Sequence, residues 1–198
     1  MEIYIVRHGE TVWNQSRLLQ GSRNIELSRE GREAAIARAE QLKDIDFDII
    51  YSSPLSRAYE TACIIRGNRS IDIIKDDRLR EINFGINEGQ SSIELQKDQN
   101  HPFYKFFHDP ANYQAPEGGE SLKDVALRTK EFMEQVIEPQ KDKLNRVMIA
   151  GHGAMNKGIM CHVLHHGLDE YWSGGLQKNC GVFIVTLDDN GYRQIGEM

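Results

Sequence analysis

Three apolar runs of this chain each lead into a polar cluster that contains arginine or histidine. The first run leads into Arg7 and His8, the second shortly precedes Arg57, and the third leads into His152. Arginine presents a planar fork that matches phosphate oxygens bidentately, and a neutral histidine can act as a nucleophile or carry a proton. Two arginines and two histidines, with a carboxylic acid nearby to protonate a leaving oxygen, suit phosphoryl transfer through a phosphohistidine.

These clusters come together only if the apolar runs are parallel strands of one sheet. Short apolar runs predict strands at residues 3–6, 47–51, 70–74, 147–150, 182–187 and 192–195. Helices are expected between them, and strands that alternate with helices predict a mainly parallel sheet covered on both faces. Ligands of such sheets bind at the carboxyl ends of the strands, so the clusters should share one rim.

Three of the helices can be given approximate bounds or starting residues. A helix over residues 28–42 is expected to be capped by Ser28, and another is expected over residues 121–137. Ser53 is expected to cap the helix that carries the second cluster, with Pro54 at the first helical position.

Length and composition limit the fold and the partners. Residues 1–198 are expected to form one domain, with a partly helical insertion or lid at 88–120, where the periodicity is weak. The formal net charge of −6 argues against nucleic acid or an anionic membrane as a partner. Three widely spaced cysteines, with no signal peptide and no membrane-spanning run, favour a cytoplasmic protein.

The segment Val6-Arg7-His8-Gly9-Glu10-Thr11, followed by Trp13 and Asn14, closely resembles the signature of the histidine phosphatase superfamily, the phosphoglycerate-mutase-like enzymes. Four further segments resemble motifs of this family in the expected order. They are Ser52-Ser53-Pro54-Leu55-x-Arg57-Ala58-x-x-Thr61-Ala62, Leu79-Arg80-Glu81-Ile82-Asn83-Phe84-Gly85, Gly118-Gly119-Glu120-Ser121 and His152-Gly153. The resemblance covers almost the whole chain, and it fits the smaller, broad-specificity phosphatases of the family.

The resemblance implies a role for each matching residue of the catalytic set. His8 would be the nucleophile that takes the phosphoryl group, while Arg7, Arg57 and His152 would hold the phosphate. Glu81 would protonate the leaving group and would then act as the base that activates water. Other carboxylates near Glu81 in the sequence remain alternatives for this acid, namely Asp76, Asp77 and Glu88.

The resemblance also implies the substrate pocket and the fold. Asn14 would donate a hydrogen bond in the phosphate pocket, and Gln20 and Gly21 would line its entrance. Gly153 would join His152 at the binding site. The family's fold is a three-layer α/β/α sandwich whose largely parallel sheet has one antiparallel edge strand. Neither a metal ion nor another cofactor is expected, because the cationic side chains already supply the charge.

Two positions depart from the family pattern, and one cluster suggests a different chemistry. Asn87 stands where members often carry Trp or Leu, and Lys157 stands where many carry Arg; neither belongs to the catalytic set. The run Cys161-His162-x-x-His165-His166 contains residue types that bind zinc, and its histidines share a helical face. Because no further ligand can be identified, we interpret this run as a polar helix end.

The same catalytic set serves phosphatases and mutases, so the choice between them depends on the expected lid. A mutase must keep water from the phosphohistidine and hold a small substrate that carries a carboxylate, and both needs favour extra cations. Residues 88–120 contain two lysines against six carboxylates, and they are instead aromatic. The rings are Phe103, Tyr104, Phe106, Phe107 and Tyr113. We therefore expect a phosphomonoester hydrolase, with a phosphoglycerate mutase as the alternative.

A third interpretation is a non-catalytic module that binds phosphorylated ligands. Such a module has no use for an acid beside a nucleophile, so the complete set that includes His8 and Glu81 speaks against it. The expected partner is a small phosphorylated metabolite. A homodimer is left open, because the sequence does not specify the oligomeric state.

Overall fold

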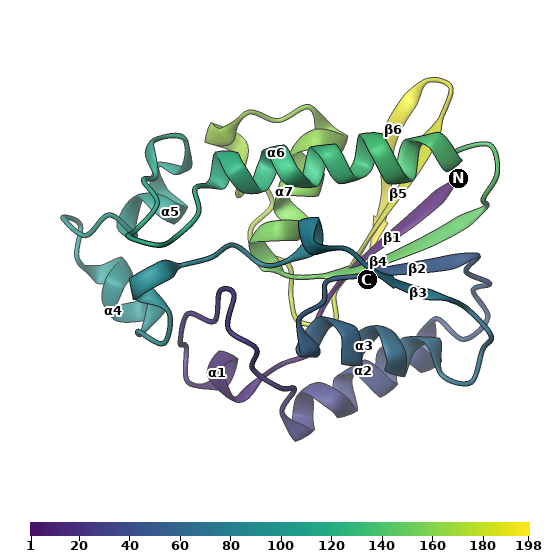
Figure 1. Cartoon of the computed structure of the whole chain (residues 1–198), viewed down its shortest axis with the longest axis horizontal. Coiled ribbons are helices and arrows are strands. Elements are labelled where there is room, and N and C mark those ends of the chain that lie inside the picture. The colour runs from purple at the N-terminus through teal and green to yellow at the C-terminus, as the bar shows by residue number, and fades with distance from the viewer.

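A six-stranded sheet forms the centre of the computed structural model, which describes residues 1–198 (Figure 1). Its strands are β1 (Glu2–Arg7), β2 (Ile49–Ser52), β3 (Ile73–Lys75), β4 (Arg146–Gly151), β5 (Val182–Asp188) and β6 (Gly191–Glu197). They follow the order β3-β2-β4-β1-β5-β6, in which the first four strands pair in parallel. Strand β5 runs antiparallel to both of its neighbours, β1 and β6.

Helices cover both faces of this sheet. On one face lie α2 (Arg29–Gln41) and α3 (Ser56–Arg66), and on the other lie α6 (Leu122–Phe132) and α7 (Gly153–Leu164) (Figure 1). The other α-helices are short: α1 (Val12–Gln15), α4 (Ser92–Lys97) and α5 (Tyr104–His108). The 3-10 helices are η1 (Asp77–Leu79), η2 (Gly85–Asn87), η3 (Pro110–Asn112), η5 (Glu138–Gln140) and η6 (Leu168–Glu170), and η4 (Met133–Ile137) is a π-helical turn.

The side chains of β1 show why both faces are covered. Ile3 and Ile5 pack into the core beneath α6 and α7, whereas Tyr4 and Val6 pack into the core beneath α2 and α3. Successive residues of a strand point to opposite faces, so a strand that is apolar throughout requires helices on both sides. The predicted α/β/α fold with a largely parallel sheet is confirmed. The strand that opposes the others, β5, lies one position inside the edge formed by β6.

The helix starts agree with the prediction at residue 28 and differ from it at residue 53. Ser28 caps α2, because its Oγ accepts from the Gly31 N–H at 3.0 Å. The prediction that Ser53 caps α3 is wrong: α3 begins at Ser56, and Leu55 occupies the N-cap position. The Ser53 hydroxyl group instead contacts His152, which follows β4. A contact between distant segments has therefore replaced the local cap.

Residues 88–120 contain α4, α5 and η3, and they pack their aromatic rings together. Phe103, Phe106 and Tyr113 are buried with Phe84 in a cluster that rests on α6. The predicted helix over 121–137 is α6 followed directly by the wider turn η4. None of the helices has both the length and the apolar surface that are needed to cross a membrane.

Candidate active site

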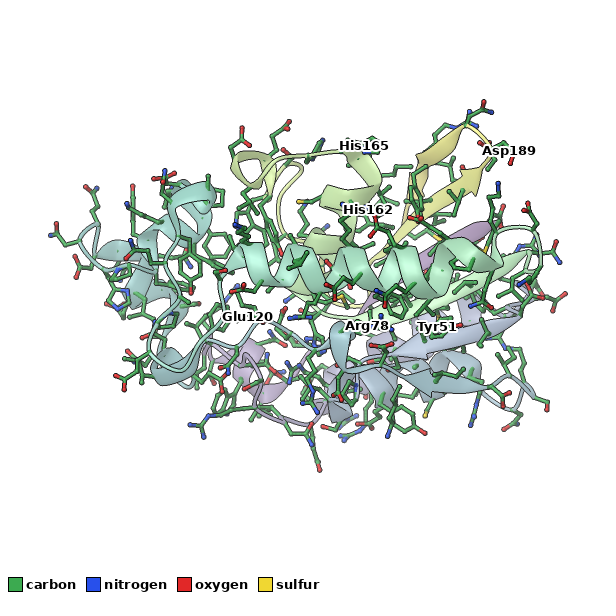
Figure 2. All side chains as sticks on the ribbon, turned by 45° about the horizontal axis from the view of Figure 1, so that its top comes forward. Tyr51, Arg78, Glu120, His162, His165 and Asp189 are labelled. Carbon is green, nitrogen blue, oxygen red and sulfur yellow. The ribbon has the colours of Figure 1, made fainter.

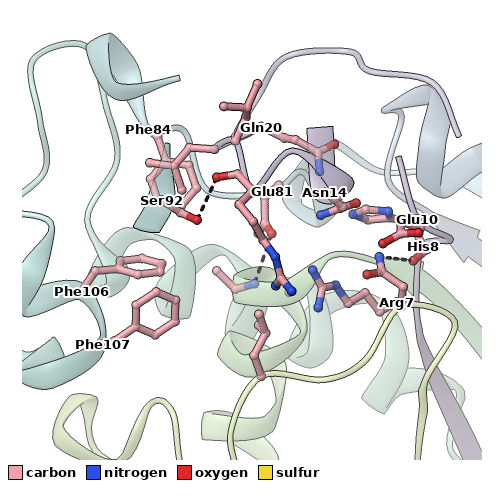
Figure 3. A pocket seen from close by; sticks show the side chains of 18 of the residues that line it. Arg7, His8, Glu10, Asn14, Gln20, Glu81, Phe84, Ser92, Phe106 and Phe107 are labelled. Atoms are coloured by element: carbon pink, nitrogen blue, oxygen red, sulfur yellow. Dashed lines mark hydrogen bonds between the residues drawn. The ribbon is translucent and has the colours of Figure 1, made fainter. Parts of the chain in front are cut away.

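A cavity of about 560 Å³ opens beside the carboxyl end of β1 (Figure 3). Eight of the nine residues predicted to form the site line this cavity. They are Arg7, His8, Asn14, Gln20, Gly21, Arg57, Glu81 and Gly153. The ninth, His152, lies directly behind the lining, with its ring centroid 5.1 Å from that of His8. The structure thus brings together segments from almost the whole length of the chain.

His8 directly follows β1 and is 3% exposed. Its Nδ1 lies 2.6 Å from the Gly9 carbonyl oxygen. Because a carbonyl can only accept, this contact places the ring proton on Nδ1 and leaves the Nε2 lone pair free. Burial, and then the cations of Arg57 and Arg7, lower the pKa of His8 well below its ordinary value. His8 is therefore neutral at physiological pH, and the neutral imidazole is the nucleophilic form.

The backbone that carries His8 is tied to the start of α3. Thr61 Oγ1 accepts from the Gly9 N–H at 3.0 Å and donates to the Arg57 carbonyl oxygen at 2.7 Å. A Cβ at Gly9 would lie 2.5 Å from the carbonyl oxygen of Gly31, so this close approach to α2 requires glycine. The position of His8 is therefore set jointly by α2 and α3.

His152 is fully buried at the N-terminus of α7. Ser53 Oγ accepts from the Leu55 N–H at 3.3 Å, so its own hydrogen can point to His152 Nε2, which lies 2.8 Å away. With the hydroxyl group as the donor, the ring proton is on Nδ1, which has no hydrogen-bond partner in the protein. Burial, and then the Arg57 cation, lower the pKa of His152 well below its ordinary value. A neutral His152 can thus donate from Nδ1 to an anion held beside His8.

Arg57 is fully buried and Arg7 is partly buried, and neither forms an ion pair. The Arg57 guanidinium donates to the carbonyl oxygens of Arg23 at 2.6 Å and Gly21 at 2.8 Å, and that of Arg7 donates to the Gln177 carbonyl. The Nε atoms of both arginines are buried and unpaired. Burial lowers the pKa of Arg57 to about 10, which leaves it charged at neutral pH. Two such cations with spare N–H donors form a site for a phosphate-like anion.

Glu81 is held at the first turn of α7. Its Oε1 accepts from the N–H groups of Ile82 and Met155, each at 3.0 Å, and its Oε2 accepts from that of Ala154 at 3.2 Å. The N-terminus of a helix favours a carboxylate because its N–H groups lack partners within the helix. The sequence therefore places a carboxyl group on the cavity wall, in the same cavity as His8.

The alternative acids are engaged elsewhere, and none of them lines the cavity. Asp76 and Asp77 pair with arginines of their own segment. Glu88 accepts from the Ser22 N–H at 2.7 Å and supports the loop behind the cavity. A Cβ at Gly21 would lie 2.1 Å from Glu88 Oε1, and Gly21 also has a positive φ of 52°, so this position strongly favours glycine.

Asn14 and Gln20 both line the cavity, and their amides have unused groups. Asn14 Oδ1 accepts from the backbone N–H and the hydroxyl group of Thr11, both at 3.1 Å. These contacts fix the amide so that its Nδ2 hydrogens are the groups left for a ligand. Gln20 is 7% exposed, and its Oε1 has no partner in the protein.

The opposite end of the cavity is aromatic. The ring centroid of Phe107 lies 4.8 Å from that of Phe106 and 4.9 Å from that of Trp172. Trp172 also donates from Nε1 to the Phe106 carbonyl oxygen. Figure 3 shows Phe106 and Phe107 across the cavity from His8. The cavity thus joins an anion-binding end to an apolar end that can accept a carbon skeleton.

The remaining candidates lie outside this cavity. No group of three or more histidine, cysteine, aspartate or glutamate side chains is arranged to hold a metal ion. In the run 161–166, His162 instead pairs with a glutamate of η5 at 2.8 Å. Lys157 is 5% exposed, donates to the Ser173 carbonyl, and lines a separate cavity of about 80 Å³. Asn87 is buried in η2.

Residues that hold the catalytic set in place were missed by the sequence analysis. The Gln177 carbonyl accepts from Arg7, and Asn179 Nδ2 donates to the His8 carbonyl at 3.0 Å. Both lie in the connection that precedes β5, and no local pattern marks them. Ser53 and Thr61, in contrast, stand inside a segment that resembles a family motif, so their positions carried a signal that could have identified them.

Comparison with known proteins identifies the family of the chain. The sequence profile of the histidine phosphatase superfamily (branch 1) matches residues 3–196. Phosphoserine phosphatase 1 of Hydrogenobacter thermophilus is 33% identical over 190 residues, which cover 96% of this chain and 88% of that protein. A 2,3-bisphosphoglycerate-dependent phosphoglycerate mutase of Parvibaculum lavamentivorans is 35% identical over 198 residues, covering 96% of this chain and 91% of that protein.

A solved structure shares the fold of this chain. Bacillus stearothermophilus YhfR has a TM-score of 0.89 to this chain at 33% identity, and the match covers 98% of this chain and 94% of that one. Relatives named as a phosphatase and as a mutase therefore resemble this chain to a similar degree.

Proposed function

Since this chain belongs to branch 1 of the histidine phosphatase superfamily, we propose that it hydrolyses phosphomonoesters by transferring the phosphoryl group to His8 and then to water. The observation that best supports this proposal is the neutral His8, whose free Nε2 lies in one cavity with the unpaired cations Arg7 and Arg57. We take the substrate to be a small phosphorylated metabolite.

In the first step, the His8 Nε2 lone pair attacks phosphorus while the bond from phosphorus to the leaving oxygen breaks. Protonated Glu81 gives its proton to that oxygen, so the alcohol leaves neutral and Glu81 becomes a carboxylate. Arg7, Arg57 and the His152 Nδ1–H oppose the charge on the remaining phosphoryl oxygens.

In the second step, the Glu81 carboxylate takes a proton from water as the water oxygen attacks phosphorus. The bond between Nε2 and phosphorus breaks, inorganic phosphate forms, and His8 regains its neutral ring. Glu81 thereby regains the proton that it gave in the first step. The same carboxyl group therefore serves both half-reactions.

The cavity favours hydrolysis over the mutase reaction. Outside the His8 end, the only cation on its wall is Arg17, and several of the other residues there are aromatic or aliphatic. A carboxylate on a three-carbon substrate therefore finds a single cation there. The mutase of Parvibaculum lavamentivorans is nevertheless as similar to this chain as the phosphatase is, so a phosphoglycerate mutase is kept as the second candidate.

Release of inorganic phosphate tests the proposal. Wild-type protein should release phosphate from p-nitrophenyl phosphate and from members of a panel of sugar and glycerate phosphates, whereas His8→Ala should not. His165→Asn is a matched control, because His165 is exposed and does not line the cavity. Equal activity in wild type and His8→Ala would refute a phosphohistidine mechanism.

A second assay separates the two candidate reactions. A mutase interconverts 3- and 2-phosphoglycerate and is stimulated by 2,3-bisphosphoglycerate, whereas a phosphatase releases phosphate without stimulation. An alkaline denaturing quench during turnover should trap a phosphohistidine, recognised by its later loss in acid, in wild type and none in His8→Ala. If the rate of interconversion exceeds the rate of phosphate release, the mutase becomes the better-supported function.

A further inference from the structure

Glu81 lies on a segment that has no helix or strand of its own. Residues 80–84 connect η1 to η2 as an irregular stretch, and such segments are usually the more mobile parts of a fold. A general acid, however, must stay within hydrogen-bond reach of the oxygen that it protonates. The N–H groups that bind the Glu81 carboxyl group fix its oxygens. The backbone on either side of Glu81 needs contacts of its own.

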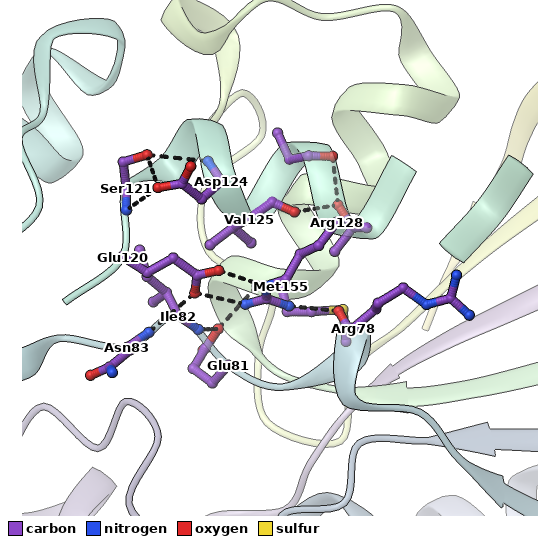
Figure 4. Close-up of polar contacts among 12 residues, drawn as sticks. Arg78, Glu81, Ile82, Asn83, Glu120, Ser121, Asp124, Val125, Arg128 and Met155 are labelled. Atoms are coloured by element: carbon purple, nitrogen blue, oxygen red, sulfur yellow. Dashed lines mark hydrogen bonds and ion pairs between the residues drawn. The ribbon is translucent and has the colours of Figure 1, made fainter. Parts of the chain in front are cut away.

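An ion pair between Glu120 and Arg128 holds this backbone on both sides of Glu81 (Figure 4). Arg128 Nε donates to Glu120 Oε1 at 2.7 Å, and Nη2 donates to Oε2 at 3.0 Å. Arg128 Nη1 donates to the carbonyl oxygen of Arg78 at 2.6 Å. After Glu81, the Asn83 N–H donates to Glu120 Oε2 at 3.4 Å, and the Asn83 carbonyl accepts from the Glu120 N–H at 2.8 Å.

The ion pair is anchored on rigid helices. Arg128 lies in α6, which approaches α7 closely: a Cβ on Gly158 of α7 would lie 2.8 Å from Thr129 Oγ1 of α6. The first turn of α7 in turn binds the Glu81 carboxyl group. The pair therefore ties the backbone near Glu81 to α6, and α6 packs on α7, whose first turn binds the Glu81 carboxyl oxygens. Figure 2 shows Arg78 and Glu120 beside α6.

The pair is more sheltered than a typical surface ion pair. The side chains of Arg128 and Glu120 are 17% and 21% exposed, and the guanidinium group binds the carboxylate through two N–H groups. Such bidentate contacts are directional as well as strong, whereas exposed pairs contribute little. Neither side chain lines the cavity, so neither is placed to touch a substrate.

We propose that the Glu120–Arg128 pair positions Glu81 for proton transfer. This role rests on the proposed function, in which Glu81 protonates the leaving oxygen. Without the pair, the Arg78 carbonyl loses its hydrogen bond to α6, and the Glu120 carboxylate is no longer held against the Asn83 N–H. The Glu81 carboxyl group is then in reach of the leaving oxygen for less of the time. The groups that bind the phosphoryl oxygens keep their own contacts, so proton transfer suffers while phosphate binding does not.

The dependence of the rate on the leaving group tests this role. The alkoxide of glycerol 3-phosphate needs a proton to leave, whereas p-nitrophenolate leaves readily without one. In Arg128→Met, we expect kcat/KM for glycerol 3-phosphate to fall about 10- to 100-fold and that for p-nitrophenyl phosphate to fall less than about threefold. The ratio kcat/KM is the quantity to compare, because it reports the steps up to loss of the leaving group.

Two further variants separate positioning from other effects. Arg146→Met is the matched control, because Arg146 pairs with Glu2 at 2.8 Å near the amino ends of β4 and β1; both of its rates should stay within about twofold of wild type. Arg128→Lys keeps the positive charge, which also acts on His152, but it loses the bidentate contact. We expect it to show the same selective loss to a smaller extent.

The possible failures are distinguishable. An equal loss for both esters in Arg128→Met would overturn the proposal, because a loss of folded protein lowers both rates alike; unchanged rates for both esters would overturn it as well. Failure of the proposed function would instead be seen in the wild type, which would release phosphate from neither ester, or in His8→Ala, which would be as active as the wild type.

Discussion

The two ends of the cavity are held in place by different forces. At the His8 end, the guanidinium groups of Arg7 and Arg57 donate to backbone carbonyls from distant loops, and each donor has a fixed direction. At the other end, the rings of Phe106, Phe107 and Trp172 pack through apolar contacts. Apolar contact depends on area and shape, whereas hydrogen bonding depends on individual atoms. The first end should therefore fix the reaction, and the second should influence which esters react.

The two ends also differ in what they contribute to stability. Burial lowers the pKa of Arg7 and that of Arg57, which means that the folded protein disfavours these charges. A bound phosphate would supply a counter-charge to both cations. The aromatic rings bury apolar surface whether or not a ligand is present. Function therefore opposes stability at one end only.

Removal of a cation from the His8 end should have the largest effect. Arg57→Met keeps most of the buried volume but removes the guanidinium group, and we expect kcat/KM to fall about 10³-fold for every ester. All esters share the phosphoryl group, so the loss should be uniform. Initial rates with p-nitrophenyl phosphate and glycerol 3-phosphate measure it, with the exposed Arg29→Met as the control. If the losses differ by more than about tenfold between esters, Arg57 also acts on the leaving group.

The pH dependence of stability should also come from the His8 end. His8 and His152 have pKa values lowered by burial, so the unfolded chain binds protons below about pH 6.5 that the folded chain does not. Their contribution is present above that pH and is lost as the pH falls toward the folded pKa values. Each histidine should reduce the free energy of unfolding by about 1.4 kcal/mol per pH unit in this window.

Urea denaturation in phosphate-free buffer at pH 7, 6 and 5 measures this slope. His8→Asn should show a pH slope smaller by about 1.4 kcal/mol per unit, whereas His165→Asn should keep the wild-type slope. At the aromatic end, Trp172→Ala should change stability by the same amount at each pH. A wild-type slope in His8→Asn would show that this histidine is not held neutral by the fold.

How far the sequence predicts each end follows from where its residues lie along the chain. Arg7, His8 and Arg57 stand within short segments next to apolar strands, so strand pattern and motif spacing locate them together. Trp172 and Gln177 lie in the long connection between α7 and β5, which has no pattern of its own. Their contacts to Phe106 and Arg7 depend on how the chain returns to the site, and no local signal encodes that.

Ser53 shows that a local sequence signal can also predict a contact that does not form. A serine directly before a proline is typical of a helix start, and this local signal predicted a cap. The hydroxyl group instead contacts His152, which lies 99 residues further along the chain. The strand predictions were correct because several apolar residues support each of them. A cap prediction depends on one side chain, which can form its hydrogen bond with a distant partner instead.

Removing an aromatic ring from the aromatic end should change the preference of the enzyme among esters. Trp172→Ala removes a half-buried ring beside Phe107, and we expect kcat/KM for 1-naphthyl phosphate to fall about tenfold, since such apolar contacts contribute about 1–3 kcal/mol. The value for glycerol 3-phosphate should change less than about threefold. Trp172→Phe keeps a ring and should retain most of the 1-naphthyl phosphate activity. Equal losses for both esters would mean that Trp172 supports the fold and not the substrate.

The smallest effect should come from Arg17, the one cation on the cavity wall outside the His8 end. Its side chain is exposed and makes no hydrogen bond or ion pair within the protein, so its attraction for a second anionic group is screened by solvent and salt. In Arg17→Gln we expect KM for 3-phosphoglycerate to rise about threefold at low salt, with kcat unchanged. KM for p-nitrophenyl phosphate, which has no carboxylate, should stay at the wild-type value.

The salt dependence of this effect decides what it means. If Arg17 acts only as a screened charge, adding about 0.5 M salt should bring wild type and Arg17→Gln to the same KM. A loss of about 30-fold or more that persists in salt would instead reveal a sheltered carboxylate site. Such a site would give the aromatic end a directional donor like those at the His8 end, and it would favour the mutase over the phosphatase.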